Sequence, residues 1–152
     1  MNPGKIRQKT VADKAQRVRE MLGAIGSLPL ASVAELTSDP RMAAAGESFL
    51  RRALEGLLDL GRYVLAKGFG KVVPEYAAIA DELAAQGVLA GDDARKLRSM
   101  ARYRNRMVHF YDDITPTELY KILTEERGDV EAVLPAIVAW LADHPEVSSD
   151  EL

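Results

Sequence analysis

Cysteine is absent from the 152-residue chain, and only two histidines, His109 and His144, are present. Without thiols the protein can form no disulfide, no thiolate nucleophile and no cysteine-based zinc site. Two isolated histidines also argue against a histidine-rich metal site. Any chemistry must therefore use His, Arg, Tyr or carboxylate side chains, and we expect neither a metal nor a cofactor.

Long apolar runs are also absent. No stretch approaches the roughly 20 apolar residues that span a bilayer, and residues 1–18 contain no apolar segment typical of a signal peptide. This predicts a cytoplasmic protein that does not enter a membrane. Because 47% of the residues are hydrophobic, we expect one domain over residues 1–152, with its core at about 10–142 and a frayed polar tail at 143–152.

The period-two alternation of β-strands does not occur over a strand's length, whereas apolar residues recur at helical spacing throughout. The sequence therefore predicts an all-α fold, an antiparallel bundle of four to five helices. "TPTE" predicts Thr115 as the N-cap of the last helix, with Pro116 at its first position and Glu118 completing a capping box. Pro135 should kink or divide that helix. The expected helices cover about 7–25, 39–67, 74–86, 92–109 and the segment from 115 onward.

The charge is unevenly distributed. A net charge of -3 argues against a protein that coats nucleic acid through many phosphate contacts. Between Arg95 and Arg106, however, there are six basic residues and no acidic one. These cations either form a solvated helical face that complements the helix dipole, or they belong to a site for an anionic ligand.

Arg104 stands out on the fourth expected helix. On a helical wheel it falls in the middle of an apolar stripe formed by Leu97, Met100, Ala101, Met107, Val108 and Tyr111. A guanidinium there must find a carboxylate, a phosphate or a wet interface. Two interpretations remain open: Arg104 forms a buried ion pair, or the stripe contacts another subunit and Arg104 lines a site at that seam.

His109 falls on the polar side of the same wheel, together with Arg98, Arg102, Asn105 and Arg106. Asn105 lies one turn earlier and is placed to hydrogen-bond the imidazole and fix its tautomer. Five residues turn an ideal helix through about 140°, so Arg104 and His109 of one chain should not point to the same place. This favours a pair that is completed across a dimer axis.

The stretch "RNRMVHFY" resembles the R-x4-6-H signature of HEPN-domain ribonucleases, with Arg104, Asn105 and His109 at its positions. The longer string "RNRMVHFYDDITPTELYKIL" resembles the HepT type of HEPN toxin, which has an R-x4-H-x-Y motif. Upstream, "FLRRALEGLLDLGRYVLA", "VPEYAAIADELAAQGVL" and "DDARKLRSMARYRN" are similar to that family in order and spacing. The resemblance covers roughly residues 10 to 142.

This resemblance implies a helical homodimer with its active site at the interface, and a metal-independent endoribonuclease toxin. It also implies a partner antitoxin, a minimal nucleotidyltransferase that inactivates the toxin by transferring AMP to Tyr111. In such an enzyme His109 would transfer protons, Arg104 would stabilise the phosphate and Asn105 would orient the imidazole. Arg102 and Arg106 are the predicted contacts to the RNA backbone.

A second hypothesis belongs to another class of protein. The chain would then be a non-catalytic helical partner that binds the nucleotide, or presents the substrate, for a nucleotidyltransferase. Arg104 would serve only in an ion pair. An activity assay separates the two hypotheses.

Overall fold

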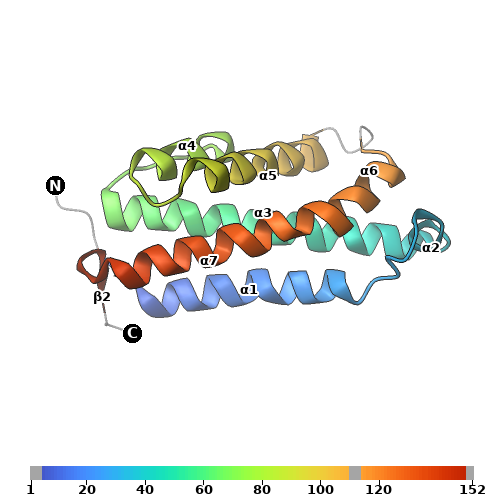
Figure 1. Ribbon diagram of the computed structural model, residues 1–152, viewed down its shortest axis with the longest axis horizontal. Coiled ribbons are helices and arrows are strands. Elements are labelled where there is room, and N and C mark those ends of the chain that lie inside the picture. The colour runs from blue at the N-terminus through green and yellow to red at the C-terminus, as the bar shows by residue number, and fades with distance from the viewer. Residues whose placement is uncertain (1–4, 110–113, 150–152) are drawn as a thin grey trace.

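The structure, a computed structural model, describes residues 5–109 and 114–149, and within them the chain forms the predicted all-α bundle (Figure 1). The long helix α3 runs through the middle, with α4 and α5 on one side of it and α1 on the other, while α7 crosses alongside. The elements are β1 (Ile6–Arg7), α1 (Gln8–Gly26), α2 (Val33–Thr37), α3 (Pro40–Phe69), α4 (Tyr76–Ala85), α5 (Gly91–His109), α6 (Pro116–Lys121), the π-helix η2 (Ile122–Glu126), α7 (Arg127–Asp143), the 3-10 turn η3 (Pro145–Val147) and β2 (Ser148–Ser149).

Helix α3 begins and ends as its sequence predicts. The Asp39 side chain accepts a hydrogen bond from the Arg41 backbone N–H at 3.0 Å, and Pro40 occupies the first turn. Gly70 ends the helix in the left-handed conformation, with φ 65°. Ten residues of α3 are buried, so its burial against the surrounding helices stabilises the core.

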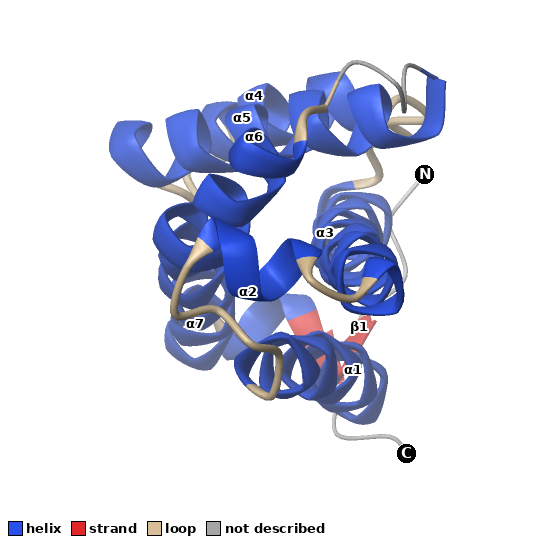
Figure 2. Cartoon of the chain, turned by 90° about the vertical axis from the view of Figure 1, so that its right-hand side faces the viewer, coloured by secondary structure: helices blue, strands red, loops and turns tan. Residues whose placement is uncertain are grey.

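The two ends of the bundle are closed differently. Helices α2 and α6 lie at one end, and the two short strands lie at the other (Figures 1 and 2). Ile6 pairs with Ser148 and Arg7 with Ser149 in parallel register. Over residues 145–149 this differs from the predicted frayed tail, because the pairing places the fully buried Ile6 in the core beside this segment, while residues 150–152 lie outside the described part of the chain.

The last helix starts where "TPTE" predicts, since Thr115 Oγ1 accepts the Glu118 N–H at 3.1 Å. It is divided, but not at Pro135. The interruption is the π-helix η2, and α7 continues unbroken through Pro135. A proline removes only one helical hydrogen bond, and the buried Val133 and Ile137 on either side of it keep the helix packed on the core.

Helix α5 keeps its predicted bounds within one residue, but its apolar stripe packs inside its own chain. Met100 and Met107 are only 4% and 5% exposed in the monomer. These two residues are therefore covered by their own chain and not by a second subunit, while the homodimer itself stays a prediction. Val108, which was assigned to the same stripe, is instead 40% exposed.

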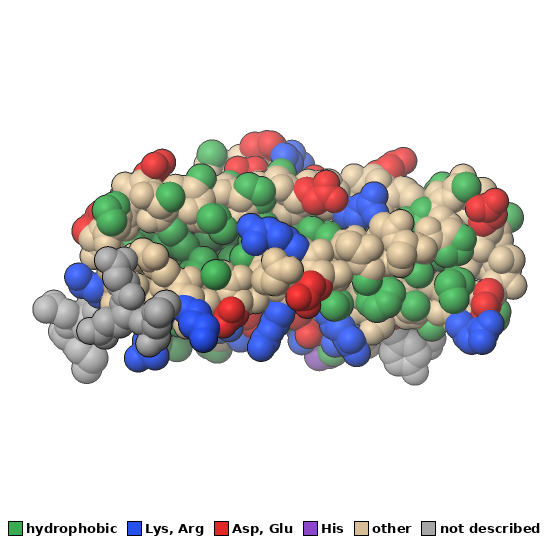
Figure 3. Space-filling view, turned by 90° about the horizontal axis from the view of Figure 1, so that it is seen from below, with side chains coloured by type: hydrophobic (Ala, Val, Ile, Leu, Met, Phe, Trp, Pro, Cys, Tyr) green, Lys and Arg blue, Asp and Glu red, His purple; other side chains and the backbone are tan. Residues whose placement is uncertain are grey.

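The face opposite to α4 and α5 is shown in Figure 3, where hydrophobic side chains line a hollow. Between α1 and α7 there is a groove of about 360 Å³, lined mainly by apolar residues such as Val11, Ala15, Val138 and Leu141. Among the described residues, no helix has the length and apolar content needed to cross a membrane.

Gly61 sets how closely α4 approaches α3. A Cβ at this position would lie 2.9 Å from Ile79 Cγ2 and 3.0 Å from Leu83 Cδ1, both on α4. Ile79 and Leu83 are fully buried and cannot easily move aside. The missing side chain therefore allows α4, and Tyr76 at its first turn, to sit close against α3.

We predict that Gly61→Ala lowers the free energy of unfolding by about 1–3 kcal/mol, because overpacking forces α4 away from α3. Chemical denaturation followed by circular dichroism measures this change. Gly23→Ala is the matched control, since nothing lies within 4 Å of a Cβ there. It should stabilise α1 by about 0.5–1 kcal/mol, and equal effects of the two substitutions would contradict the packing argument.

Candidate active site

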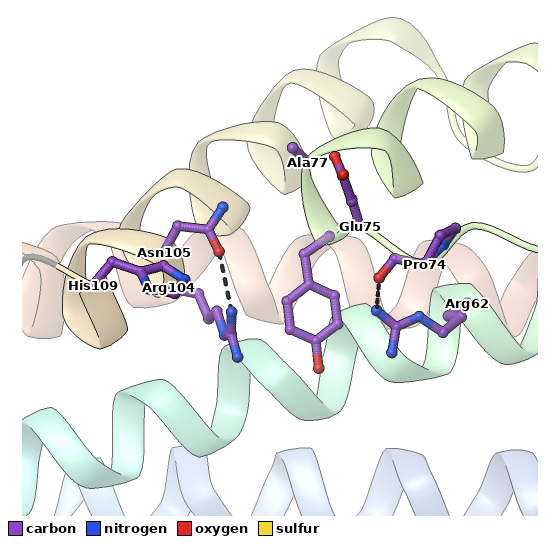
Figure 4. A pocket seen from close by; sticks show the side chains of 8 residues that line it. Arg62, Pro74, Glu75, Ala77, Arg104, Asn105 and His109 are labelled. Carbon is purple, nitrogen blue, oxygen red and sulfur yellow. Dashed lines mark hydrogen bonds between the residues drawn. The ribbon is translucent and has the colours of Figure 1, made fainter.

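A polar pocket of about 430 Å³ lies between α3, the start of α4 and the C-terminal half of α5 (Figure 4). It contains all three of the predicted catalytic residues, and it adds residues that the sequence did not single out. Its lining consists of Arg62, Pro74, Glu75, Tyr76, Ala77, Arg104, Asn105 and His109.

Helix α3 supplies the charged base of the site. Glu55, Asp59 and Arg62 are spaced by four and three residues, which places them on one side of the helix. They face the first turn of α4 and the last turns of α5, where each contacts a side chain: Glu55 contacts Arg104, and both Asp59 and Arg62 contact Tyr76.

Arg104 is anchored within its own chain. Its Nε donates to Glu55 Oε1 at 3.2 Å, and its Nη1 donates to Asn105 Oδ1 at 3.2 Å. Glu55 also pairs with Arg51, and the Arg104 guanidinium carbon lies 4.6 Å from the centroid of the Tyr76 ring. The ion pair with Glu55 matches the first of the two interpretations of the helical wheel. Arg104 nevertheless lines the pocket.

Tyr76 is held from several directions. Its hydroxyl donates to Asp59 Oδ1 at 2.7 Å, and the guanidinium carbon of Arg62 lies 4.6 Å from its ring centroid. Partial burial, together with the hydrogen bond to the Asp59 carboxylate, raises the pKa of Tyr76 to about 12. The phenol therefore stays protonated near neutral pH. Its ring forms one side of the pocket in a fixed position.

Arg62 is locked in place by the connection between α3 and α4. Its Nε donates to the Val73 carbonyl at 3.1 Å, its Nη2 to the Pro74 carbonyl at 2.7 Å, and its Nη1 to Asp59 at 3.3 Å. Figure 4 shows Arg62 and Arg104 on opposite sides of the pocket. Because both cations contact Tyr76, its ring is held between them.

His109 and Asn105 complete the pocket from α5. Arg104 and His109 of one chain were not expected to point to the same place, yet both line this pocket. Asn105 accepts a hydrogen bond from Arg104. Its predicted role in orienting the imidazole stays a prediction. Tyr111, the predicted modification site, lies outside the described residues.

Arg102 and Arg106 differ from one another. Arg106 makes a bidentate ion pair with Glu118 of α6, at 2.6 and 2.9 Å, so its guanidinium links α5 to α6, and its predicted contact to the RNA backbone stays a prediction. Arg102 is exposed on α5, and its predicted contact to the RNA backbone stays a prediction. Neither residue lines the pocket.

The pocket suits an anion. Arg62 and Arg104 provide planar donors that match phosphate oxygens, and His109 offers an imidazole nitrogen that can accept or donate a proton. In Figure 4 the Glu75 carboxylate points away from both guanidiniums. Over residues 5–109 and 114–149, no group of three or more His, Asp or Glu side chains is arranged to hold a metal ion.

A family model and several solved structures resemble the chain. The family model described as "Ribonuclease HepT-like" matches residues 13–137. No curated protein matches the chain. Eleven chains of solved structures match it.

Three of these structures have closely similar folds. A tri-AMPylated HEPN toxin of Shewanella oneidensis in complex with an MNT antitoxin has a TM-score of 0.76 at 16% identity, over 85% of this chain and 96% of that one. A toxin-antitoxin structure with AMP-PNP has a TM-score of 0.78 at 14% identity, over 87% and 99%. The cytosolic protein YutE of Bacillus subtilis, of unknown function, has a TM-score of 0.77 at 17% identity, over 95% of each chain. At these identities the likeness establishes the fold.

Proposed function

Because the chain belongs to the HepT-like ribonuclease family, we propose that it is a metal-independent endoribonuclease toxin of a toxin-antitoxin pair. The observation that carries this proposal is the convergence of Arg104, Asn105 and His109 on one polar pocket of a single chain. Its partner antitoxin is a minimal nucleotidyltransferase that inactivates it by adenylylating Tyr111. Two of the similar structures are toxin-antitoxin assemblies, one of them with a tri-AMPylated toxin, which supports this pairing.

The proposed reaction is the attack of the ribose 2'-oxygen on the neighbouring phosphorus. The bond from phosphorus to the 5'-oxygen breaks, leaving a 2',3'-cyclic phosphate and a free 5'-hydroxyl. His109 accepts the proton of the 2'-hydroxyl and returns it to the leaving 5'-oxygen. Arg104 stabilises the charge that accumulates on the phosphate oxygens, and Asn105 holds the Arg104 guanidinium in position through its side-chain oxygen.

The ion pair between Arg104 and Glu55 is the observation that favours the second candidate function. In a non-catalytic binding partner this pair would serve packing alone. The pair uses Nε of Arg104, while Nη2 has no bonding partner among the described residues. Arg104 therefore keeps a donor for a phosphate, and the ribonuclease proposal remains the better supported of the two.

The test uses the purified chain and cellular RNA in the presence of EDTA. We expect a homodimer in sedimentation, and cleavage products that carry 2',3'-cyclic phosphate ends. An RNA substrate with 2'-O-methyl groups should resist cleavage, because its nucleophile is blocked. Cleavage that requires Mg²⁺ or leaves 3'-hydroxyl ends would contradict the mechanism, and intact RNA would favour the binding partner.

A further inference from the structure

The pocket contains a second arginine that the proposed reaction does not use. Arg62 lies across the pocket from Arg104, and each guanidinium carbon is 4.6 Å from the centroid of the same ring, Tyr76. Two cations placed on the two sides of one aromatic ring are stabilised by its faces. The ring lies between them, which favours one phosphate at each guanidinium over a single phosphate shared by both.

Hydrogen bonds hold the Arg62 guanidinium in this position. Three separate acceptors bind its three nitrogens: the carbonyls of Val73 and Pro74 and the Asp59 carboxylate. A guanidinium has five N–H donors, so two of them remain unengaged by the described part of the chain. The side chain is 37% exposed, and it lines the pocket.

The separation of the two cations suits a nucleic-acid strand. Neighbouring phosphates along one strand are separated by a sugar, and the two guanidiniums are separated by the Tyr76 ring, so each guanidinium can face a different phosphate of one strand. We therefore propose that Arg62 binds the phosphate next to the scissile one, so that the pocket recognises two successive phosphates of single-stranded RNA, with Arg104 at the scissile phosphate and Tyr76 as the spacer between them.

This inference rests on the proposed function for the identity of the ligand, yet it can be tested by binding alone. The probes are dinucleotides with a 2'-O-methyl group at the internal linkage, which prevents cleavage. One probe has the internal phosphate only. The other two have an added 5'-phosphate or 3'-phosphate, because the pocket does not define the direction of the strand.

We expect one of the two added phosphates to strengthen binding to the wild-type protein by about ten- to a hundredfold, as typical for a hydrogen bond between charged groups. In Arg62→Gln this gain should disappear, so that the three probes bind this variant with similar affinities. Arg62→Lys keeps the charge and should recover part of the gain. Isothermal titration calorimetry at fixed ionic strength measures all three affinities.

Each other outcome overturns the inference. If neither added phosphate strengthens binding, or if the gain persists in Arg62→Gln, Arg62 does not bind a second phosphate. A loss of affinity for all probes in Arg62→Gln would mean that Arg62 only maintains the pocket. Failure of the proposed function looks different: the probes would bind as expected, but RNA with a free 2'-hydroxyl would remain uncut.

Discussion

Replacement of His109 by alanine is expected to lower the rate of RNA cleavage by about 10²- to 10⁴-fold, the usual contribution of a positioned proton-transfer group. His109 lies at the end of α5 and is exposed, so its loss leaves no cavity. Exposed substitutions of this kind usually change stability by no more than about 0.5 kcal/mol. The experiment is a cleavage assay on a defined RNA, together with circular dichroism and thermal unfolding of the same preparations.

The chain offers a matched control for this substitution in its other histidine. His144 stacks on Trp140, with ring centroids 4.1 Å apart, and its Nδ1 lies 2.8 Å from the Trp140 carbonyl oxygen. It does not line the pocket. His144→Ala should therefore cut RNA like the wild type. If His109→Ala also cuts normally, the assignment of proton transfer to His109 is wrong.

Arg104→Ala should also abolish cleavage, but its interpretation is less direct. The substitution removes the phosphate-binding group and at the same time leaves Glu55 without one of its two arginine partners. Part of the loss could then come from a rearranged pocket. Because Arg104 is half-buried against Glu55 whereas His109 is exposed, His109 is the sharper test of catalysis.

Much of the fold follows from local signals that act within a few residues. Asp39 with Pro40, Thr115 with Pro116, and Gly70 each begin or end a helix through a backbone hydrogen bond or a backbone conformation. Such interactions can be recognised in sequence because both partners are neighbours. The π-helix η2 was missed, since no residue type marks it and the packing of the helix around it determines where it forms.

From the sequence, only the site residues that lie on a single helix could be predicted. Arg104, Asn105 and His109 share α5 and a recognisable spacing, whereas Arg62 and Tyr76 come from other helices and meet them through tertiary packing. A signal for Arg62 did exist in the series Glu55, Asp59 and Arg62, whose spacing places three charged residues on one side of α3. A helical wheel shows which residues are apolar, but not whether their own chain covers them, so the burial of Met100 and Met107 within the chain could not be predicted from it.

Adenylylation of Tyr111 is expected to abolish the nuclease activity. In this reaction the tyrosine oxygen bonds to the α-phosphorus of ATP, pyrophosphate leaves, and the phenolic proton is released, with the partner nucleotidyltransferase and Mg²⁺ as the catalysts. Two peptide units limit the distance between the Cα atoms of His109 and Tyr111 to about 7 Å. A phosphodiester attached there would bring negative charge next to His109 and Arg104, and would compete with RNA for the same cations.

The selectivity for Tyr111 has a structural basis in the other tyrosines. Each of the four is half-buried, and its hydroxyl already takes part in a hydrogen bond: Tyr63 with the Arg7 N–H, Tyr76 with Asp59, Tyr103 with Glu126, and Tyr120 with the Leu30 carbonyl. A hydroxyl must leave such a bond before it can attack ATP. For Tyr76 and Tyr103, burial and the adjacent carboxylate also raise the pKa to about 12, which disfavours the nucleophilic phenolate.

Co-expression with the partner nucleotidyltransferase, followed by tryptic mass spectrometry, tests this expectation. AMP should be found on Tyr111 and on none of the other four tyrosines, and the modified protein should not cut RNA. Tyr111→Phe should remain toxic to cells in the presence of the partner, because it lacks the acceptor oxygen but keeps the ring. Tyr63→Phe is the matched control, and the partner should still abolish its nuclease activity. Unmodified Tyr111 in a protein that the partner has nevertheless silenced would show that the antitoxin inhibits by binding alone.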